Sequence, residues 1–405
     1  VFVTSPWDVS NEIGHMGYIK ELATGKGIPV LMETMLDEEM WLSVAAEEGS
    51  PPSHNWIAQH PPLYYVVMVP SYWLGSMFGD TFESPLYAGR MWNGFMMVLA
   101  LYFLFRMVRE YAANDFTALS VVAMVGSIPL ISQTAAGVTN DTLVILLSIA
   151  LAWRWMCFYK TVNTKNLLIL GLVIGLCGIC KYTFLPYMAA VSTFVVWYLI
   201  QGKQISLKPL LAFVSLAWLP LVFWIIRNLV IFGKALPADL DYLTFETSTD
   251  LSVVEYLRAY PFFTHLFRSF WGIFGWLGSG QKLITTTMHL PVIYQFSYAL
   301  LVTMLAAASI YYLFLQAKKS QYQQALYSFV GCGFLTVLIY HYNFFPNEAF
   351  FITWMVYLTI FSCLFAVSFG IMQLWLPTRL FDNWRTRIQL ETIIVCSFFL
   401  FVLIL

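Results

Sequence analysis

Charged side chains are scarce in this sequence. Asp, Glu, Lys and Arg make up 11% of the 405 residues, while hydrophobic residues make up 60%. Soluble globular domains carry about 25% charged residues, so the composition excludes a soluble globule of this length. The formal net charge of −1 also excludes the strongly basic face that nucleic-acid binding requires. We therefore predict an integral membrane protein that does not bind nucleic acid.

Cysteine is uncommon as well, and no cysteine is placed to form a disulfide in an exported loop. All of them lie inside or at the edge of apolar runs: Cys157, Cys177, Cys180, Cys332, Cys363 and Cys396. No disulfide framework is therefore predicted. Cys177 and Cys180 form a CxxC motif in "GLCGICKY". The motif has no second pair and no soluble redox fold around it, so we interpret both residues as packing residues.

Motifs for nucleotides and metals are missing too. The sequence contains no Gly-rich phosphate loop of the GxGxxG or Walker type, which argues against a nucleotide sugar or ATP as a direct substrate. Glu12, His15 and His60 could be considered as metal ligands, but they lack the close paired spacing of zinc motifs. We predict neither a cofactor nor a metal.

Long apolar runs account for most of the chain. A helix needs about 20 residues to cross a hydrocarbon core of about 30 Å, and lipid offers no partner to an open backbone. We predict an all-α polytopic membrane protein with about 10 to 11 transmembrane helices, including one expected before Val1. The predicted spans cover residues 88–108, 115–137, 141–159, 166–183, 184–200, 209–231, 291–315, 325–345, 349–375 and 389–405.

Basic residues mark one side of the predicted bundle. The positive-inside rule makes that side cytoplasmic, and the opposite side holds two long segments. The chain thus divides into a first extracytoplasmic loop (1–87), a transmembrane core (88–231), a second extracytoplasmic loop (232–290) and C-terminal transmembrane helices (291–405). The short basic connections contain Arg106, Arg109, Arg154, Lys160, Lys165, Lys203, Lys208, Lys318, Lys319, Arg379, Arg385 and Arg387.

The first loop is predicted to contain helices that lie in the membrane interface. The stretches "NEIGHMGYIKELATG" and "LDEEMWLSVAAEE" are amphipathic, and residues 61–78 are rich in Tyr, Trp and Met. Tyr and Trp favour the boundary between lipid and water. Pro61 and Pro62 suit the start of a helix, where a missing N–H costs nothing.

Several ionisable residues lie near the predicted membrane boundary, where such residues are costly and indicate function. By the predicted topology all of them face the extracytoplasmic side, so they can line one site. They are Asp8, Glu12 and His15 in "PWDVSNEIGHMG", His60 in "HPPLYY", Arg90 at the start of a span, Asp141 in "TNDT", Lys181 in "KYT" and Arg227 in "IIRN".

The order of these motifs resembles the GT-C superfamily of membrane glycosyltransferases. The similarity is strongest to the branch that contains protein O-mannosyltransferases and lipid A aminoarabinose transferases, and it extends to about residue 290. The resemblance implies an enzyme that transfers a sugar from a polyprenyl phosphate to an extracytoplasmic lipid, glycan or protein. The lipid-linked donor and the membrane lipids are then its partners, and it needs no separate cofactor.

The resemblance also implies roles for individual residues. Family members carry an Asp-Glu pair in the first loop whose Asp acts as a base, but this sequence has Asn11 and Glu12. Glu12 or Asp8 is then the expected base, and Asp141 matches a second catalytic acid. Arg227, His60, Arg90 and Lys181 are expected at the donor phosphate, although a structural role is favoured for Arg90 and Lys181. The substrate cavity would contain Asn11, His15, Asn140 and Asn228.

Two other functions stay open at this stage. A transporter or flippase for a lipid-linked or polar solute would use the same charges along a path through the membrane. An inactive relative that serves as a subunit of a membrane complex is compatible with Asn11. We expect a bacterial inner membrane location with the site on the outer face, or alternatively the endoplasmic reticulum. The sugar and the acceptor are not specified by the sequence.

Overall fold

A computed structural model of the chain describes residues 9, 11–41, 53–79, 82–112, 115–126, 129–202, 206–237, 273–274 and 288–289. The helices that precede the bundle are α1 (Glu12–Ala23), α2 (Glu38–Trp41), η1 (Trp56–Gln59) and α3 (Leu63–Ser76). The bundle consists of α4 (Glu83–Ala112), α5 (Asp115–Gly126), α6 (Pro129–Ala136), α7 (Asp141–Lys160), α8 (Thr164–Gly178), η2 (Tyr182–Phe184), α9 (Leu185–Gly202) and α10 (Leu207–Phe232).

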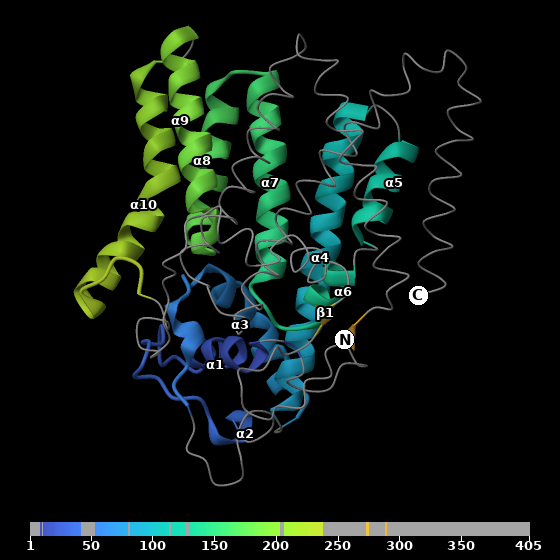
Figure 1. Ribbon diagram of the computed structural model, residues 1–405, viewed down its shortest axis with the longest axis vertical. Helices are drawn as coiled ribbons and strands as arrows, with labels where there is room; N and C mark the ends of the chain where they lie inside the picture. The colour runs from blue at the N-terminus through green and yellow to red at the C-terminus, as the bar shows by residue number, and fades with distance from the viewer. Residues whose placement is uncertain are drawn as a thin grey trace, which may run out of the picture.

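The long helices run side by side, and α1, α2 and α3 lie across one end of them (Figure 1). Within the described residues, three helices are long and apolar enough to cross a membrane: Glu83–Glu110 of α4, Asp141–Phe158 of α7 and Leu207–Phe232 of α10. Large apolar side chains on these helices are exposed, among them Phe95, Phe223 and Val230. These features confirm the predicted helical membrane class.

The helices agree with most of the predicted spans in this part of the chain, with one clear difference. Residues 115–137 were expected to form one span but form two separate short helices, α5 and α6. Pro129 is the first residue of α6, and proline cannot donate a hydrogen bond to the preceding turn. Residues 127 and 128, which lie between the two helices, are outside the described residues.

Part of the prediction concerns residues outside those described. The predicted spans from residue 291 onward and nearly all of the second loop belong to this part, as does Asp8. In the second loop the structure describes a two-residue antiparallel pair, β1 (Ile273–Phe274) and β2 (Met288–His289). Every other element of the described residues is helical.

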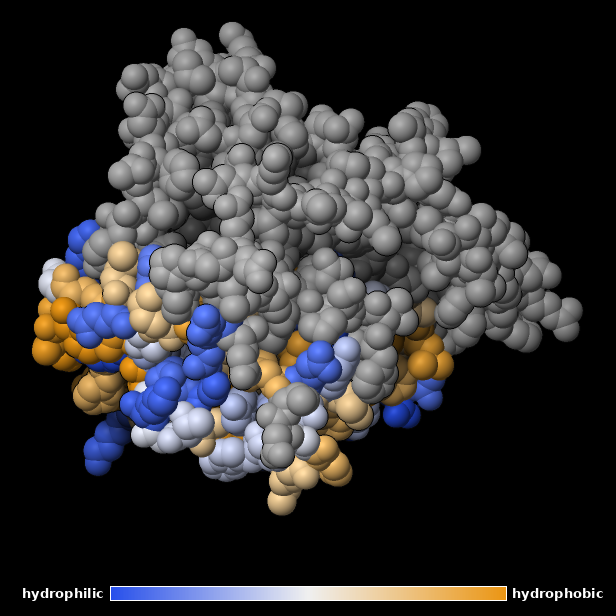
Figure 2. Space-filling view, turned by 90° about the horizontal axis from the view of Figure 1, so that it is seen from below, coloured by the Kyte–Doolittle hydropathy of each residue, from blue (hydrophilic) through white to orange (hydrophobic). Residues whose placement is uncertain are grey.

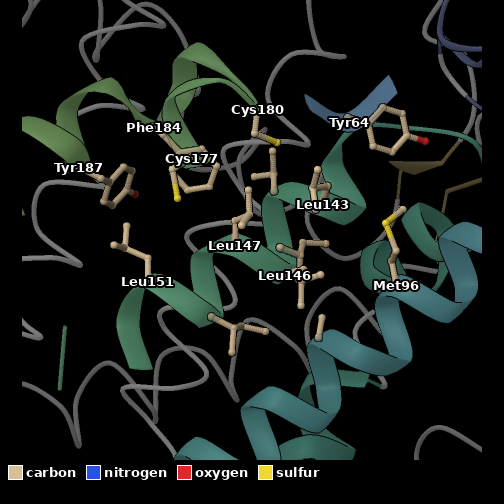
Figure 3. Close-up of a cluster of buried hydrophobic side chains, with 14 of the residues drawn as sticks. Tyr64, Met96, Leu143, Leu146, Leu147, Leu151, Cys177, Cys180, Phe184 and Tyr187 are labelled. Atoms are coloured by element: carbon tan, nitrogen blue, oxygen red, sulfur yellow. The ribbon is translucent and has the colours of Figure 1, made fainter. Parts of the chain in front are cut away.

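The core of the bundle forms around α7. Leu143, Leu146, Leu147 and Leu151 of α7 lie between Met96 of α4 and the side chains that α8, η2 and α9 contribute (Figure 3). Cys177 and Cys180 are free thiols with no exposed surface. Their position confirms that the CxxC motif serves packing.

Glycines let α8 approach α10 closely. A Cβ added at Gly175 would overlap the backbone carbonyl oxygen of Leu216, and one at Gly171 would lie 2.9 Å from the carbonyl oxygen of Phe213. Backbone atoms cannot move aside as the end of a side chain can. The contact between the two helices therefore requires Gly175.

Replacing Gly175 by Ala is expected to destabilise the protein by about 1–3 kcal/mol, because overpacking forces the helices apart. The measurement is the apparent melting temperature in detergent. Gly94→Ala in α4 is the matched control, since its nearest neighbour would be the Ala135 carbonyl oxygen at 3.9 Å, an ordinary contact. Equal melting temperatures for the two variants would contradict the close approach of α8 and α10.

Candidate functional site

A fully buried ion pair joins the start of α1 to α4. Arg90 donates from Nε to Oε1 of Glu12 at 2.9 Å and from Nη2 to Oε2 at 2.7 Å. Both side chains have no exposed surface. Two parallel charge-assisted bonds of this kind are strong and directional, and they occupy both oxygens of the Glu12 carboxylate.

The segment 137–140, which connects α6 to α7, is held by two buried side chains. The backbone N–H of Val138 donates to Oε1 of Glu12 at 2.9 Å. Nδ2 of Asn93 in α4 donates to the carbonyl oxygens of Gly137 and Thr139, at 2.5 and 3.2 Å. The segment thus satisfies its backbone groups with buried side chains instead of helix or sheet partners.

A second ion pair stands at the end of this segment. Nζ of Lys181, in the turn between α8 and η2, donates to Oδ1 of Asp141 at 2.7 Å and to Oδ1 of Asn140 at 3.2 Å. The side chains of Lys181 and Asp141 are 9% and 15% exposed. Asp141 is the first residue of α7, where the helix dipole favours a negative charge. The second oxygen of Asp141, Oδ2, accepts no hydrogen bond from the described residues.

Four aromatic rings form a column beside these charges. The rings of Tyr18 and Tyr65 stack at 3.7 Å, His15 stacks on Tyr65 at 5.8 Å, and His60 stacks on His15 at 6.4 Å. Nδ1 of His15 and the hydroxyl of Tyr65 are 3.1 Å apart, within hydrogen-bond distance. Tyr64 meets both His15 and Tyr65 edge-on. The motif "HPPLYY" therefore supplies one wall of the site.

Both histidines of the column are neutral near pH 7. Burial, and then the positive charge of Lys181, lower the pKa of His60 from 6.5 to about 3. Burial also lowers the pKa of His15 well below 6.5, with smaller contributions from His60 and Lys181. An unfolded histidine binds a proton below about pH 6.5, whereas these two stay neutral in the folded protein.

The protein is therefore expected to lose stability as the pH falls from about 6.5 toward 3, because the unfolded state then binds more protons. Each histidine can contribute up to about 1.4 kcal/mol per pH unit in that window. The measurement is the apparent melting temperature between pH 7 and pH 5. His60→Gln should flatten the pH dependence, and an unchanged slope in that variant would contradict the prediction.

Asn11 occupies the position at which the resemblance to GT-C glycosyltransferases predicts a catalytic Asp. Its backbone has φ 62°, the left-handed region, and it precedes the first residue of α1. Asn is one of the few residues other than Gly that adopt this conformation at modest cost. Its Oδ1 accepts a hydrogen bond from Nε1 of Trp56 at 3.0 Å.

Arg227 lies near the end of α10 and faces the loop after α1. Its Nη2 donates to the carbonyl oxygen of Pro29 at 3.3 Å, and its Nη1 donates to Oδ1 of Asn228 at 3.2 Å. The guanidinium also lies over the ring of Trp224 at 4.6 Å. Among the described residues Arg227 makes no ion pair with a carboxylate, in contrast to Arg90 and Lys181.

Several buried polar atoms near the Lys181 pair have no hydrogen-bond partner among the described residues. They include Nδ2 of Asn140 and Nδ1 of His60. Such atoms are uncommon in folded proteins, and each one calls for a bound water, an ion or a ligand. The same described residues contain no group of three His, Cys, Asp or Glu that could hold a metal.

The structure brings most of the predicted site residues to one end of the bundle. Figure 2 views this end and shows hydrophilic residues beside hydrophobic ones, which gather mostly toward the two sides. The basic ends of α4, α7 and α8 lie at the opposite end (Figure 1). The predicted residues at the site end are Asn11, Glu12, His15, His60, Arg90, Asn140, Asp141, Lys181, Arg227 and Asn228.

Sequence reasoning missed some members of the site. Asn93 lies one turn after Arg90 on α4 and has no exposed surface, and its amide group in an apolar run was the available signal. Tyr182 accepts hydrogen bonds from Trp224 and Asn228. Trp56, which contacts Asn11, carries no signal in the sequence alone.

The fold and the site together define a helical membrane protein with paired charges and stacked aromatic rings at one end of its bundle. Residues 59–226 match the family model of dolichyl-phosphate-mannose-protein mannosyltransferases. That match confirms the predicted resemblance to GT-C glycosyltransferases, and it includes His60, Arg90, Asp141 and Lys181.

Among solved structures, the chain is similar to apo ArnT from Cupriavidus metallidurans, with 11% sequence identity and a TM-score of 0.49. The similarity covers 92% of this chain and 57% of that chain, so this sequence spans little more than half of the solved protein. A search among curated proteins gave no match.

Proposed function

We propose that this protein is a glycosyltransferase that moves a sugar from a polyprenyl phosphate to an acceptor on the extracytoplasmic side. The family match over residues 59–226 supports this class of reaction. The charge arrangement supports the kind of donor, because a phosphate leaving group must be held by a positive charge as the bond to the sugar breaks.

The observation that carries the proposal is a cation at this end of the bundle, Arg227, that makes no ion pair with a described carboxylate. Arg90 is paired with Glu12 and Lys181 with Asp141. The carboxylate in each pair offsets the positive charge that would attract a phosphate. Arg227 makes no ion pair with a described carboxylate and is only partly buried. A guanidinium binds phosphate through two parallel hydrogen bonds. We assign the donor phosphate to Arg227 and a structural role to Arg90.

Asp141 is the base that the geometry supports best. Its Oδ2 is unoccupied by described residues, whereas both oxygens of Glu12 already accept hydrogen bonds. In the proposed step the acceptor hydroxyl gives its proton to Asp141 while its oxygen bonds to the anomeric carbon. The bond from that carbon to the phosphate breaks, and polyprenyl phosphate leaves. One such displacement inverts the anomeric centre. Asp8 lies outside the described residues and stays an alternative base.

The sidedness of the site is part of the proposal. Basic residues such as Arg106, Arg154 and Lys160 lie at the bundle end opposite the site, and the positive-inside rule assigns them to the cytoplasm. The site then faces outward, in a bacterial inner membrane or the lumen of the endoplasmic reticulum. Lipid, glycan and protein acceptors are all compatible with it.

Donor binding gives the direct test. We expect purified protein to retain polyprenyl phosphate mannose, used as the probe, in native mass spectrometry. Arg227→Gln should weaken this binding about tenfold or more, since one charge-assisted contact to phosphate contributes about 1.5–3 kcal/mol. Arg106→Gln removes a charge from the opposite end and serves as the matched control. Equal binding by both variants would contradict the assignment of Arg227.

One observation favours a second function, a catalytically inactive subunit of a membrane complex. Asn11 replaces the expected Asp, and its Oδ1 is bound to Trp56. That function predicts donor binding without turnover. Incubation with polyprenyl phosphate carrying tritiated mannose and a cell-envelope extract separates the two, because only the enzyme moves label from the donor to another molecule.

A further inference from the structure

We propose that Asn93 is a positioning residue that fixes Asn140 and Asp141 in the site. This inference rests on the proposed function, in which Asp141 takes the acceptor proton. Asn93 lies in α4 and has no exposed surface. It touches neither the Lys181 pair nor any atom that would react, so its effect has to pass through the backbone of residues 137–140.

The hydrogen bonds around this segment alternate in direction. The carbonyl oxygens of Gly137 and Thr139 accept from Asn93, while the N–H of Val138 donates to Glu12. Asn93 of α4 thus holds the carbonyl groups of residues 137 and 139, and the first residue of α1 holds the N–H between them. Asn140 and Asp141 follow directly, and their side chains meet Lys181.

Asn93 also connects this segment to Tyr64, which lies beside the column of aromatic rings. Its Oδ1 accepts a hydrogen bond from the hydroxyl of Tyr64 at 3.1 Å. Tyr64 in turn meets the ring of His15 edge-on at 5.9 Å. One amide group therefore sets the separation between the wall formed by α3 and the carboxylate of Asp141.

An apolar side chain could not replace this arrangement. Burying an amide is unfavourable unless its hydrogen bonds are made, and here both amide hydrogens and the oxygen have partners. Without Asn93, two buried carbonyl oxygens would lose their donors, and each such loss costs about 1–3 kcal/mol. The segment would then move to find other partners.

The test compares two isosteric substitutions in the full-length protein reconstituted in lipid. Asn93→Asp keeps the size and an acceptor for Tyr64 but removes the amide donors. Asn166→Asp is the matched control at the opposite end of the bundle. There Nδ2 of Asn166 donates to the carbonyl oxygens of Thr161 and Cys157, and its Oδ1 accepts from Arg154. Tyr64→Phe is a milder second variant that removes only the contact to Oδ1 of Asn93.

Two readouts decide the proposal. Hydrogen exchange at amides 138–141 should become at least about tenfold faster in Asn93→Asp and not in Asn166→Asp. With the labelled mannose donor and the cell-envelope extract, kcat should fall about 10²-fold, as expected for a displacement of about 1 Å, while the donor KM stays within about twofold. Tyr64→Phe should shift both readouts in the same direction by less.

Unchanged exchange at residues 138–141 in Asn93→Asp overturns the proposal. Faster exchange with a kcat no lower than that of Asn166→Asp also overturns it, because the segment then moves without affecting the reaction. A wild-type protein that turns over no donor contradicts the proposed function instead. In that case hydrogen exchange alone decides whether Asn93 fixes the segment.

Discussion

Arg90→Met is expected to leave little folded protein. The substitution removes the counter-charge of the Glu12 carboxylate at a place where both side chains have no exposed surface. Breaking a buried pair by removing one member costs about 3–5 kcal/mol, a large part of the about 5–15 kcal/mol that holds a typical protein folded. The measurement is the yield of monodisperse protein in detergent together with its apparent melting temperature.

The partner substitution and the double variant show whether charge is the cause. Glu12→Gln strands the Arg90 charge instead and should be destabilising as well. Glu12→Gln combined with Arg90→Met removes both charges and keeps an acceptor for the N–H of Val138. This double variant is expected to recover much of the lost stability, because a buried pair contributes little net stability compared with neutral groups. If the loss of stability in the double variant equals the sum of the losses in the two single variants, the two charges do not interact.

Asp141→Asn is expected to reduce sugar transfer by about 10²–10⁴, the usual contribution of a general base. Asn has the same shape but cannot take the acceptor proton. Donor binding should stay within about twofold of wild type, since Arg227 holds the phosphate. Transfer of tritiated mannose and native mass spectrometry of the donor complex measure the two quantities separately.

The ion pair with Lys181 offers a structural explanation for the same loss, and a double variant separates the two. Asp141→Asn leaves the Lys181 charge nearly buried without its counter-charge. Adding Lys181→Met removes that charge and should restore the melting temperature. Activity should stay low if Asp141 is the base. Recovery of activity in the double variant would show that the carboxylate matters only because it balances Lys181.

The helical bundle could be predicted because its signal is local. Apolar runs such as 141–159 and 209–231 correspond closely to α7 and α10, since length and composition alone decide whether a helix can cross lipid. The two helices α5 and α6 were predicted as one span because hydropathy does not distinguish Pro129 from other residues of an apolar run.

The ionisable residues that lie at one end of the bundle could be singled out from the sequence, but not their pairing. Scarcity of charge in an apolar chain singled out Glu12, Arg90 and Lys181 individually. The partner of each depends on tertiary contacts, and Glu12 and Arg90 are 78 residues apart in the chain. For this reason the sequence left Arg90 two interpretations, a contact to the donor phosphate or a structural role, and could not name Glu12 as the group that its guanidinium binds. Asn93 was missed because an uncharged amide is a weaker signal than a charge.

The buried pair also constrains how the chain is made. Glu12 is synthesised before Arg90, so it has no ion-pair partner from α4 until that helix has been made. The Val138 amide, which also donates to Glu12, lies 126 residues after it in the chain. Arg90 is made after Glu12, so its charge can be compensated as soon as α1 packs against α4. The hydrogen bonds that join α1, α4 and the segment before α7 can therefore be completed only after all three have been synthesised, which makes this end of the bundle a late-forming part of the fold.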